Sequence, residues 1–286
     1  MKKIILLSLV FWGLQSIHAQ KKEAFKIFKS NGQKSAYKKL LKKALQADIV
    51  FFGEEHDNPI AHWLELELTK DLYKKSKKPL IIGAEMMETD NQEAVNKYVN
   101  KKVDYKTFKK EARLWSNFKT DYKPLLDFAR NNGIPFIATN IPRRYASKVY
   151  HYGFKSLDSL PDEEKKWIAP LPIAYDKNLS QYQKMLSMMG GHAGENLPKA
   201  QAIKDATMAY NILKNYKPGS LFLHFDGSYH SNYQQGIVWY IKQQNPELKI
   251  LTIDVETQEN LKKLDPKHQN KADFIIVVNQ NIPRSY

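Results

Sequence analysis

The sequence contains no cysteine. Disulfide bridges, thiolate catalysis, cysteine-ligated iron–sulfur clusters and acylation of a lipoprotein cysteine are therefore excluded. It also lacks the G-x-S-x-G elbow, the Walker loop, the G-x-G-x-x-G fingerprint and the H-E-x-x-H helix motif. Serine-nucleophile, nucleotide-binding and common zinc-protease functions consequently have no support in the sequence.

Acidic residues are scarce relative to basic ones. The chain has 30 Asp and Glu against 45 Lys and Arg, which gives a formal net charge of +15. Many of the lysines occur in pairs, such as Lys38-Lys39 and Lys109-Lys110, a pattern typical of solvated helix faces. No RNA-binding or DNA-binding motif accompanies them, so the charge favours a small anionic ligand or an anionic lipid surface over nucleic acid.

The longest apolar run is at the N-terminus. Two lysines precede the apolar stretch Ile4–Leu14, which is too short to cross a bilayer, and Ile17–Ala19 fits a cleavage site. Residues 1–19 are therefore predicted to be a signal peptide. We expect a periplasmic or secreted protein with no transmembrane helix in the mature chain, in which residues 20–286 form a single domain.

Short apolar runs alternate with helical patterns along most of the chain. The predicted strands are Ile49–Phe52, Pro79–Glu85, Ile134–Thr139, Ser220–His224, Lys249–Val255 and Phe274–Val278. This alternation predicts an α/β fold with a mainly parallel central sheet flanked by helices. The stretch Tyr145–Tyr216 lacks strand patterns and is predicted to be an inserted, mostly helical subdomain. Glu23–Leu45 is predicted to be helical, with a break at Asn31-Gly32.

The first predicted strand is followed by a concentrated group of titratable side chains. Glu54–Asp57 holds three carboxylates and a histidine, and Asn58-Pro59 then starts a helix. Ligands of open α/β sheets bind outside the carboxyl ends of the strands, where this turn lies. Simple capping of the helix by Glu54 and Asp57 is the alternative, but capping needs only one carboxylate. His62, on the helix, suits either a packed core position or a ligand.

Further reactive side chains follow the other predicted strands. Glu85, Arg143 and His230 each come at or just after a strand end, and the pattern G-x-x-H ends at both His56 and His230. Because parallel strands end at one edge, we expect these residues to share a site with Glu54. A divalent metal such as Zn or Mn is a suitable ligand partner for His56, Glu85 and His230. Glu54 has the chemistry of a general base, and Arg143 that of a binding group for an anionic part of the substrate.

The predicted helical segment adds two candidates for a cofactor site. Met185 precedes the pair Gly190-Gly191, after which His192 follows. A histidine in a flexible glycine setting suits a haem or metal ligand. For Met185, filling of a hydrophobic core is the alternative.

Several stretches resemble a known family: GEEHDNPIAH, GAEMM, LWSNFKTDYKPLLDFARNNGIPFIATNIPR and QAIKDATMA. From about Asp48 to about Val278, the chain is similar to the ChaN-like haem-binding uptake proteins, in the superfamily of TraB, the erythromycin esterases and the Tiki proteases. The resemblance implies haem binding linked to iron acquisition, with haem held at a dimer interface through a tyrosine. Tyr175 and Tyr182 are the candidate tyrosines.

The resemblance also implies a second function. In hydrolytic relatives, the two G-x-x-H histidines and a strand-end glutamate form the centre, which corresponds here to His56, His230, Glu54 and Glu85. The expectation is thus an exported haem-binding protein, with a metal-dependent or metal-free ester or amide hydrolase as the alternative and a non-catalytic module as the third reading. The chain departs from the family pattern in two ways. It lacks the lipoprotein cysteine, and it has Ala61 where the family often has a second histidine.

Overall fold

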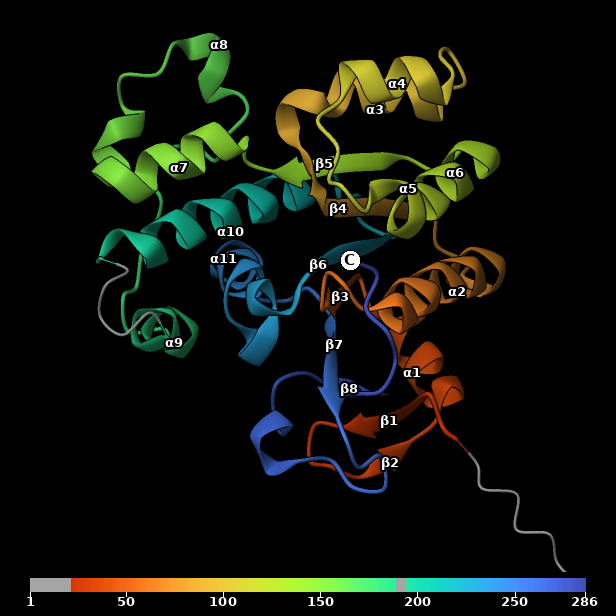
Figure 1. Ribbon diagram of the computed structural model, residues 1–286. Helices are drawn as coiled ribbons and strands as arrows, with labels where there is room; N and C mark the ends of the chain where they lie inside the picture. The colour runs from red at the N-terminus through yellow and green to blue at the C-terminus, as the bar shows by residue number, and fades with distance from the viewer. Residues whose placement is uncertain (1–21, 189–193) are drawn as a thin grey trace, which may run out of the picture.

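The computed structural model describes residues 22–188 and 194–286 (Figure 1). The predicted signal peptide and His192 lie outside the described residues. The strands form an eight-stranded sheet in the order β2-β1-β8-β7-β3-β6-β4-β5. Their bounds are β1 Phe25–Lys29, β2 Lys34–Ser35, β3 Ile49–Glu54, β4 Leu80–Glu88, β5 Phe136–Asn140, β6 Leu221–Gly227, β7 Ile250–Gln258 and β8 Phe274–Asn279.

Six strands from β8 to β5 run parallel, and β1 pairs antiparallel with both β8 and β2. The predicted α/β fold with a mainly parallel sheet is therefore confirmed. The α-helices are α1 Tyr37–Ala44, α2 Pro59–Lys75, α3 Gln92–Val99, α4 Tyr105–Glu111, α5 Phe118–Asp121, α6 Lys123–Asn132, α7 Arg143–Tyr152, α8 Asp162–Lys165, α9 Ser180–Met188, α10 Asn196–Asn215 and α11 Ile237–Gln244.

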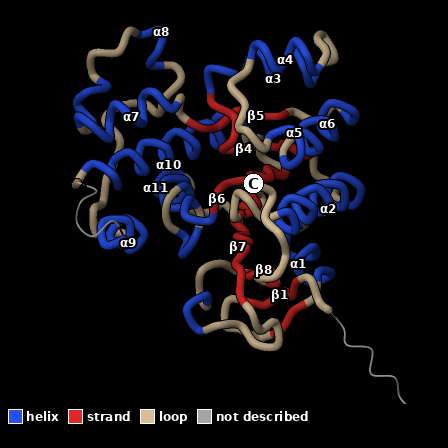
Figure 2. Tube along the Cα trace, in the orientation of Figure 1, coloured by secondary structure: helices blue, strands red, loops and turns tan. Residues whose placement is uncertain are grey.

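The sheet is covered on both faces, because successive side chains of a strand point in opposite directions. In β3, Val50 and Phe52 pack with the core under α1, α2, α3 and α6, whereas Ile49 and Phe51 pack with the core under α10 and α11. Figure 2 shows these helices on the two sides of the central strands. An uninterrupted apolar run is therefore what a strand buried on both faces requires.

The prediction of a helix from Glu23 to Leu45 is wrong in its first half. That part forms a hairpin of β1 and β2, which turns at Asn31 and Gly32, and only α1 is helical. Gly32 has a φ of +83°, which a glycine adopts without strain. The hairpin adds β1 to the open edge of β8, so that the backbone pairs there instead of within a helix.

The connection between β5 and β6 is helical, as expected for Tyr145–Tyr216. Its described part holds α7 to α10 and no strand, and α10 packs against β5, α7 and α11. Whether this segment is a separate subdomain stays a prediction. Within the described residues, no helix has the length and apolar character needed to cross a membrane.

Candidate functional site

The turn after β3 lies at the carboxyl edge of the sheet, between β6 and β7. β3 ends at Glu54, and Asn58 caps α2 by accepting hydrogen bonds from the backbone N–H groups of Ile60 and Ala61 at 3.1 and 3.3 Å. The N-cap is therefore Asn58 and not one of the carboxylates of the turn. This removes the reading in which Glu54 and Asp57 serve only to cap the helix.

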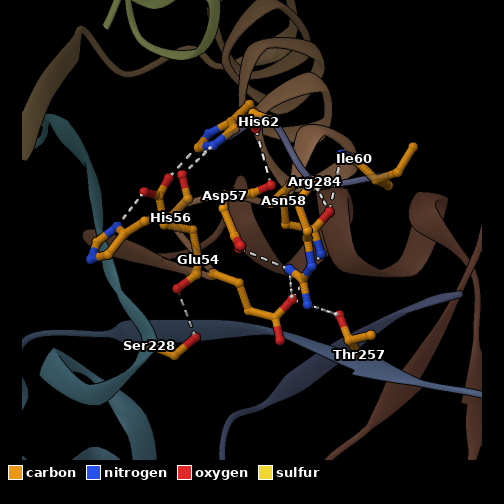
Figure 3. Close-up of polar contacts among 12 residues, drawn as sticks. Glu54, His56, Asp57, Asn58, Ile60, His62, Ser228, Thr257 and Arg284 are labelled. Carbon is orange, nitrogen blue, oxygen red and sulfur yellow. Dashed lines mark hydrogen bonds and ion pairs between the residues drawn. The ribbon is translucent and has the colours of Figure 1, made fainter. Parts of the chain in front are cut away.

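Glu54 forms the first histidine–carboxylate pair of the site. Its Oε1 lies 2.7 Å from Nδ1 of His56 and accepts a hydrogen bond from the hydroxyl of Tyr122 at 2.6 Å. Figure 3 shows the Glu54 carboxylate between the rings of His56 and His62. Burial of Glu54 favours its neutral form, but hydrogen bonds and the charge of His62 outweigh it and hold its pKa below the usual range. Glu54 is thus a buried anion that orients His56.

His230 and two carboxylates form the second pair. Nε2 of His230 lies 3.1 Å from Oε1 of Glu85, and Nδ1 lies 2.5 Å from Oδ1 of Asp205 on α10. Burial lowers the pKa of His230, but the charges of Glu85 and Asp205 outweigh burial and raise it to about 10. His230 is therefore a buried imidazolium held between two carboxylates.

Gly227, the last residue of β6, brings the two pairs together. Its N–H donates to Oε2 of Glu85 at 2.7 Å. A Cβ atom at Gly227 would lie 2.7 Å from Nε2 of His56 and 3.5 Å from Oε2 of Glu85. The free nitrogen of His56 and the carboxylate of Glu85 therefore approach the same backbone position, which has room for them only because it is a glycine.

A cleft of about 490 Å³ opens over this glycine. Both histidine–carboxylate pairs line it, so the structure brings Glu54, His56, Glu85 and His230 together at this edge of the sheet. Three cations, Lys184, Lys204 and Lys271, also line the cleft. Lys271 pairs with Glu256, whereas Lys204 forms no ion pair with the described residues. The cleft therefore combines acid–base groups with an available positive charge.

Arg143 lies outside this cleft. It lines a neighbouring cavity of about 670 Å³ together with Arg144 and Trp115. Trp115 connects the two cavities, since its ring meets that of His56 edge-on at 4.9 Å. Arg144 is held by Asp90 at 2.6 Å, whereas Arg143 is exposed and has no polar partner among residues 22–188 and 194–286. Arg143 therefore borders the site without entering it.

The candidate cofactor residues are placed differently from one another. Met185 lines the cleft. Tyr182 does not: it is 1% exposed, and its hydroxyl donates to Oδ2 of Asp205 at 2.9 Å, which places it behind His230. Tyr175 stacks on Tyr182 at 5.8 Å and is likewise absent from the cleft lining. The geometry gives neither tyrosine access to a ligand in this cleft.

Two tyrosines that sequence reasoning missed do line the cleft. Tyr229 is 40% exposed, and Tyr233 has a left-handed backbone with a φ of 60°. The ammonium group of Lys184 lies 3.2 Å from the Tyr233 hydroxyl and 4.3 Å from the ring centre. Tyr229 lies inside the second G-x-x-H pattern, and this position in the sequence could have marked it as a site residue. No sequence pattern marks Tyr233 or Asp205 in this way.

The predicted metal ligands surround the cleft without forming a compact set. In the described part of the chain, the group whose donor atoms all lie within 4.8 Å of one another is Glu54, His62 and Glu65. His56, Glu85 and His230 do not form such a group in the described part of the chain; Glu85 and His230 instead contact each other and their neighbours Gly227 and Asp205. Of the predicted ligands, His56 keeps a nitrogen directed at the cleft.

Fold and site together define an α/β protein that surrounds a strand-end cleft with two histidine–carboxylate pairs. The chain belongs to the family described as haem-binding uptake, Tiki superfamily, ChaN, whose model matches residues 40–241. This confirms the resemblance noted in the sequence.

Solved structures agree with this fold. ChaN of Campylobacter jejuni, described with cofacial haem binding, has a TM-score of 0.67 and 17% identity over 90% of this chain and 98% of its own. A Bacillus cereus protein has a TM-score of 0.53 and 12% identity over 90% and 95% of the two chains. These identities establish the fold alone.

A curated relative, the chloroplastic protein RETICULATA-RELATED 5 of Arabidopsis thaliana, is 26% identical over 197 residues. The match covers 64% of this chain and 26% of that protein. The chain thus spans about a quarter of the length of this relative.

Proposed function

We propose that this chain is an exported haem-binding protein of haem or iron uptake, and that it binds haem in the cleft over Gly227. The observation that carries the proposal is the donor set of the cleft. Tyr229 and Tyr233 present phenol groups, and His56 presents an imidazole nitrogen. Phenol and imidazole are among the side chains that ligate haem iron, so the residues present fit the group that the family name implies.

His56 has the arrangement expected of a metal-ligating histidine. Such a histidine donates its second ring N–H to a carboxylate, which fixes both the tautomer and the orientation of the ring. In His56, Nδ1 lies on Glu54 and Nε2 is directed over Gly227. Bound haem would supply an iron that takes one of these donors, and the protein's part is to orient the donor.

The cations of the cleft suit the two carboxylates of a haem. Lys204 forms no ion pair with the described residues, and Lys184 contacts only the Tyr233 ring and hydroxyl among them. Neither amino group is held in an ion pair within the described part of the chain, so both can pair with the carboxylates of a bound haem. Export rests on the signal-peptide pattern of residues 1–19, and a homodimer rests on the family resemblance.

Titration of the purified protein with haemin tests this function. We expect a saturable shift of the Soret band. Tyr229→Phe, Tyr233→Phe and His56→Ala identify the ligand, because only the variant that loses the ligand changes the spectral type. Tyr152→Phe is the matched control, since Tyr152 is 75% exposed on α7 and absent from the cleft lining. A Soret shift that does not saturate during the titration contradicts the proposal. So does a haem-bound spectrum that is the same in wild-type protein and in all three variants.

The two histidine–carboxylate pairs favour hydrolysis of an ester or amide as a second function. His56, held by Glu54, would take a proton from water at Nε2, and the protonated His230 would stabilise negative charge in the cleft. A screen of chromogenic esters and peptides tests this. We expect His56→Ala and Glu85→Gln to abolish turnover while thermal unfolding shows a folded protein. The absence of turnover for every substrate in wild-type protein would remove this function.

A further inference from the structure

A second group of metal-type side chains lies beneath the cleft, between β3 and α2. Nδ1 of His62 is 3.4 Å from Oε2 of Glu54 and 3.3 Å from Oε2 of Glu65. All three side chains are buried, with Glu65 completely inaccessible. This group is distinct from the cleft, because Glu54 uses Oε1 for His56 and Tyr122 and turns Oε2 toward His62.

Two carboxylates face one imidazole in this group, and neither carboxylate pairs with a lysine or an arginine among the described residues. Nε2 of His62 lies 3.1 Å from the backbone carbonyl of His56, so the proton of a neutral ring belongs on Nε2. In the neutral form that binds a metal ion, Nδ1 directs a lone pair at the two carboxylates. Oε2 of Glu54 and Oε1 of Glu65 are buried and have no hydrogen-bond partner among the described residues. Buried acceptors that face one another in this way require a cation, either protons or a metal ion.

The distances favour a metal ion over protons. Hydrogen bonds between an ionised histidine and a carboxylate are typically about 2.7–2.9 Å long, whereas both contacts of His62 exceed 3.2 Å. In a tetrahedral site with bonds of about 2.0–2.1 Å, neighbouring ligand atoms lie about 3.3–3.4 Å apart. The two separations from His62 Nδ1, 3.4 and 3.3 Å, match that edge length.

We propose that Glu54, His62 and Glu65 bind a divalent cation of the zinc class at a buried structural site. Glu54 Oε2, His62 Nδ1 and Glu65 Oε2 supply three ligands, which leaves the fourth position of a tetrahedral site open to a further oxygen donor. The carbonyl of His56 and the hydroxyl of Tyr122 orient these ligands from outside. The ion ties α2 to the end of β3 and fixes the carboxylate that positions His56.

The experiment measures metal in the full chain, purified without haem, chelator or histidine tag. We expect elemental analysis to find one equivalent of zinc-class metal per chain. EDTA should lower the thermal unfolding temperature, and Zn²⁺ alone should restore it. His62→Asn and Glu65→Gln should lose the equivalent. Glu67→Gln should keep it, because Glu67 lies on the same helix but pairs with Lys70 at the surface.

Two further measurements separate this site from its alternatives. His230→Gln alters the cleft and leaves the buried group intact, so loss of the metal in this variant, but not in Glu65→Gln, would overturn the proposal. Absence of metal, together with no effect of Zn²⁺ on wild-type unfolding, would show that protons occupy the group.

If the His62 and Glu65 variants do not fold, the visible spectrum of Co²⁺-loaded wild-type protein decides: intense bands support a four-coordinate site, and weak six-coordinate bands contradict it. None of these measurements depends on haem binding.

Discussion

Gly227 and His56 come from segments far apart in the chain, and the His56 ring lies over the position that a Cβ atom of residue 227 would occupy. A Cβ atom at Gly227 would lie 2.7 Å from Nε2 of His56, closer than real Cβ contacts permit. The backbone of Gly227, with φ −61° and ψ 137°, is open to any residue. The requirement for glycine at this position is therefore set by the histidine and not by the conformation of the chain.

Gly227→Ala is expected to displace the His56 ring from Glu54 and to weaken haem binding about tenfold, which corresponds to about 1.4 kcal/mol. The unfolding free energy should change by less than about 1 kcal/mol, because the ring edge is partly exposed and can move. Haemin titration and urea denaturation measure the two effects. Unchanged affinity would mean that His56 has no part in binding.

Tyr182→Phe is expected to destabilise the protein by about 1–3 kcal/mol, because the buried Asp205 loses the hydroxyl that donates to it. Urea denaturation measures the loss. Haem affinity should change little, since Tyr182 does not line the cleft. A variant with wild-type stability and no Soret shift would show instead that Tyr182 is the iron ligand, as the sequence suggested.

Stability is expected to fall as the pH rises from about 7 to 9. The pKa of His230 is raised to about 10 in the folded protein, against about 6.5 in an unfolded chain. Between these values the folded state holds one more proton, so the stabilisation is complete below about pH 6.5 and is lost as the pH approaches 10. In the His230→Gln variant, the plot of unfolding free energy against pH should fall less steeply over this range, by about 1.4 kcal/mol per pH unit. Parallel slopes of unfolding free energy against pH would contradict this.

Arg284→Ala is expected to loosen the turn after β3. The guanidinium of Arg284 donates to Glu55 at 2.8 Å, to Asp57 at 2.9 Å and to Thr257 at 3.2 Å (Figure 3). These contacts are partly exposed, so the loss of global stability should stay below about 1 kcal/mol and diminish in high salt. Amide hydrogen exchange should accelerate in residues 54–58. Unaltered exchange there would show that the turn holds without the arginine.

Much of the fold follows from local pattern. The apolar run before Glu54 and the Asn58-Pro59 start signal predicted β3 and α2, and both form where expected. The first hairpin was missed because β1 depends on the edge of β8, which is 245 to 253 residues away: Lys29 pairs with Phe274 and Phe25 with Val278. A helical pattern and a strand are hard to separate in so short a segment, and the distant partner decided between them.

The site was predictable only as far as its residues follow strands. Glu54, His56, Glu85 and His230 could be assigned to one edge, because parallel strands end together. Asp205 is in the middle of α10, where no strand end or motif marks it. The same holds for His62 and Glu65, whose spacing on one helix could indicate either core packing or a ligand pair.

The sequence by itself determined which segments are strands, because buried strands need continuous apolar runs. It also determined the edge at which reactive side chains collect. Only the tertiary structure decided how they pair: which carboxylate holds which histidine, that Tyr182 supports Asp205, and that Tyr229 and Tyr233 line the cleft. The physical reason is that pairing depends on contacts of about 3 Å between side chains of different elements, and no local pattern in the chain encodes distances of that kind.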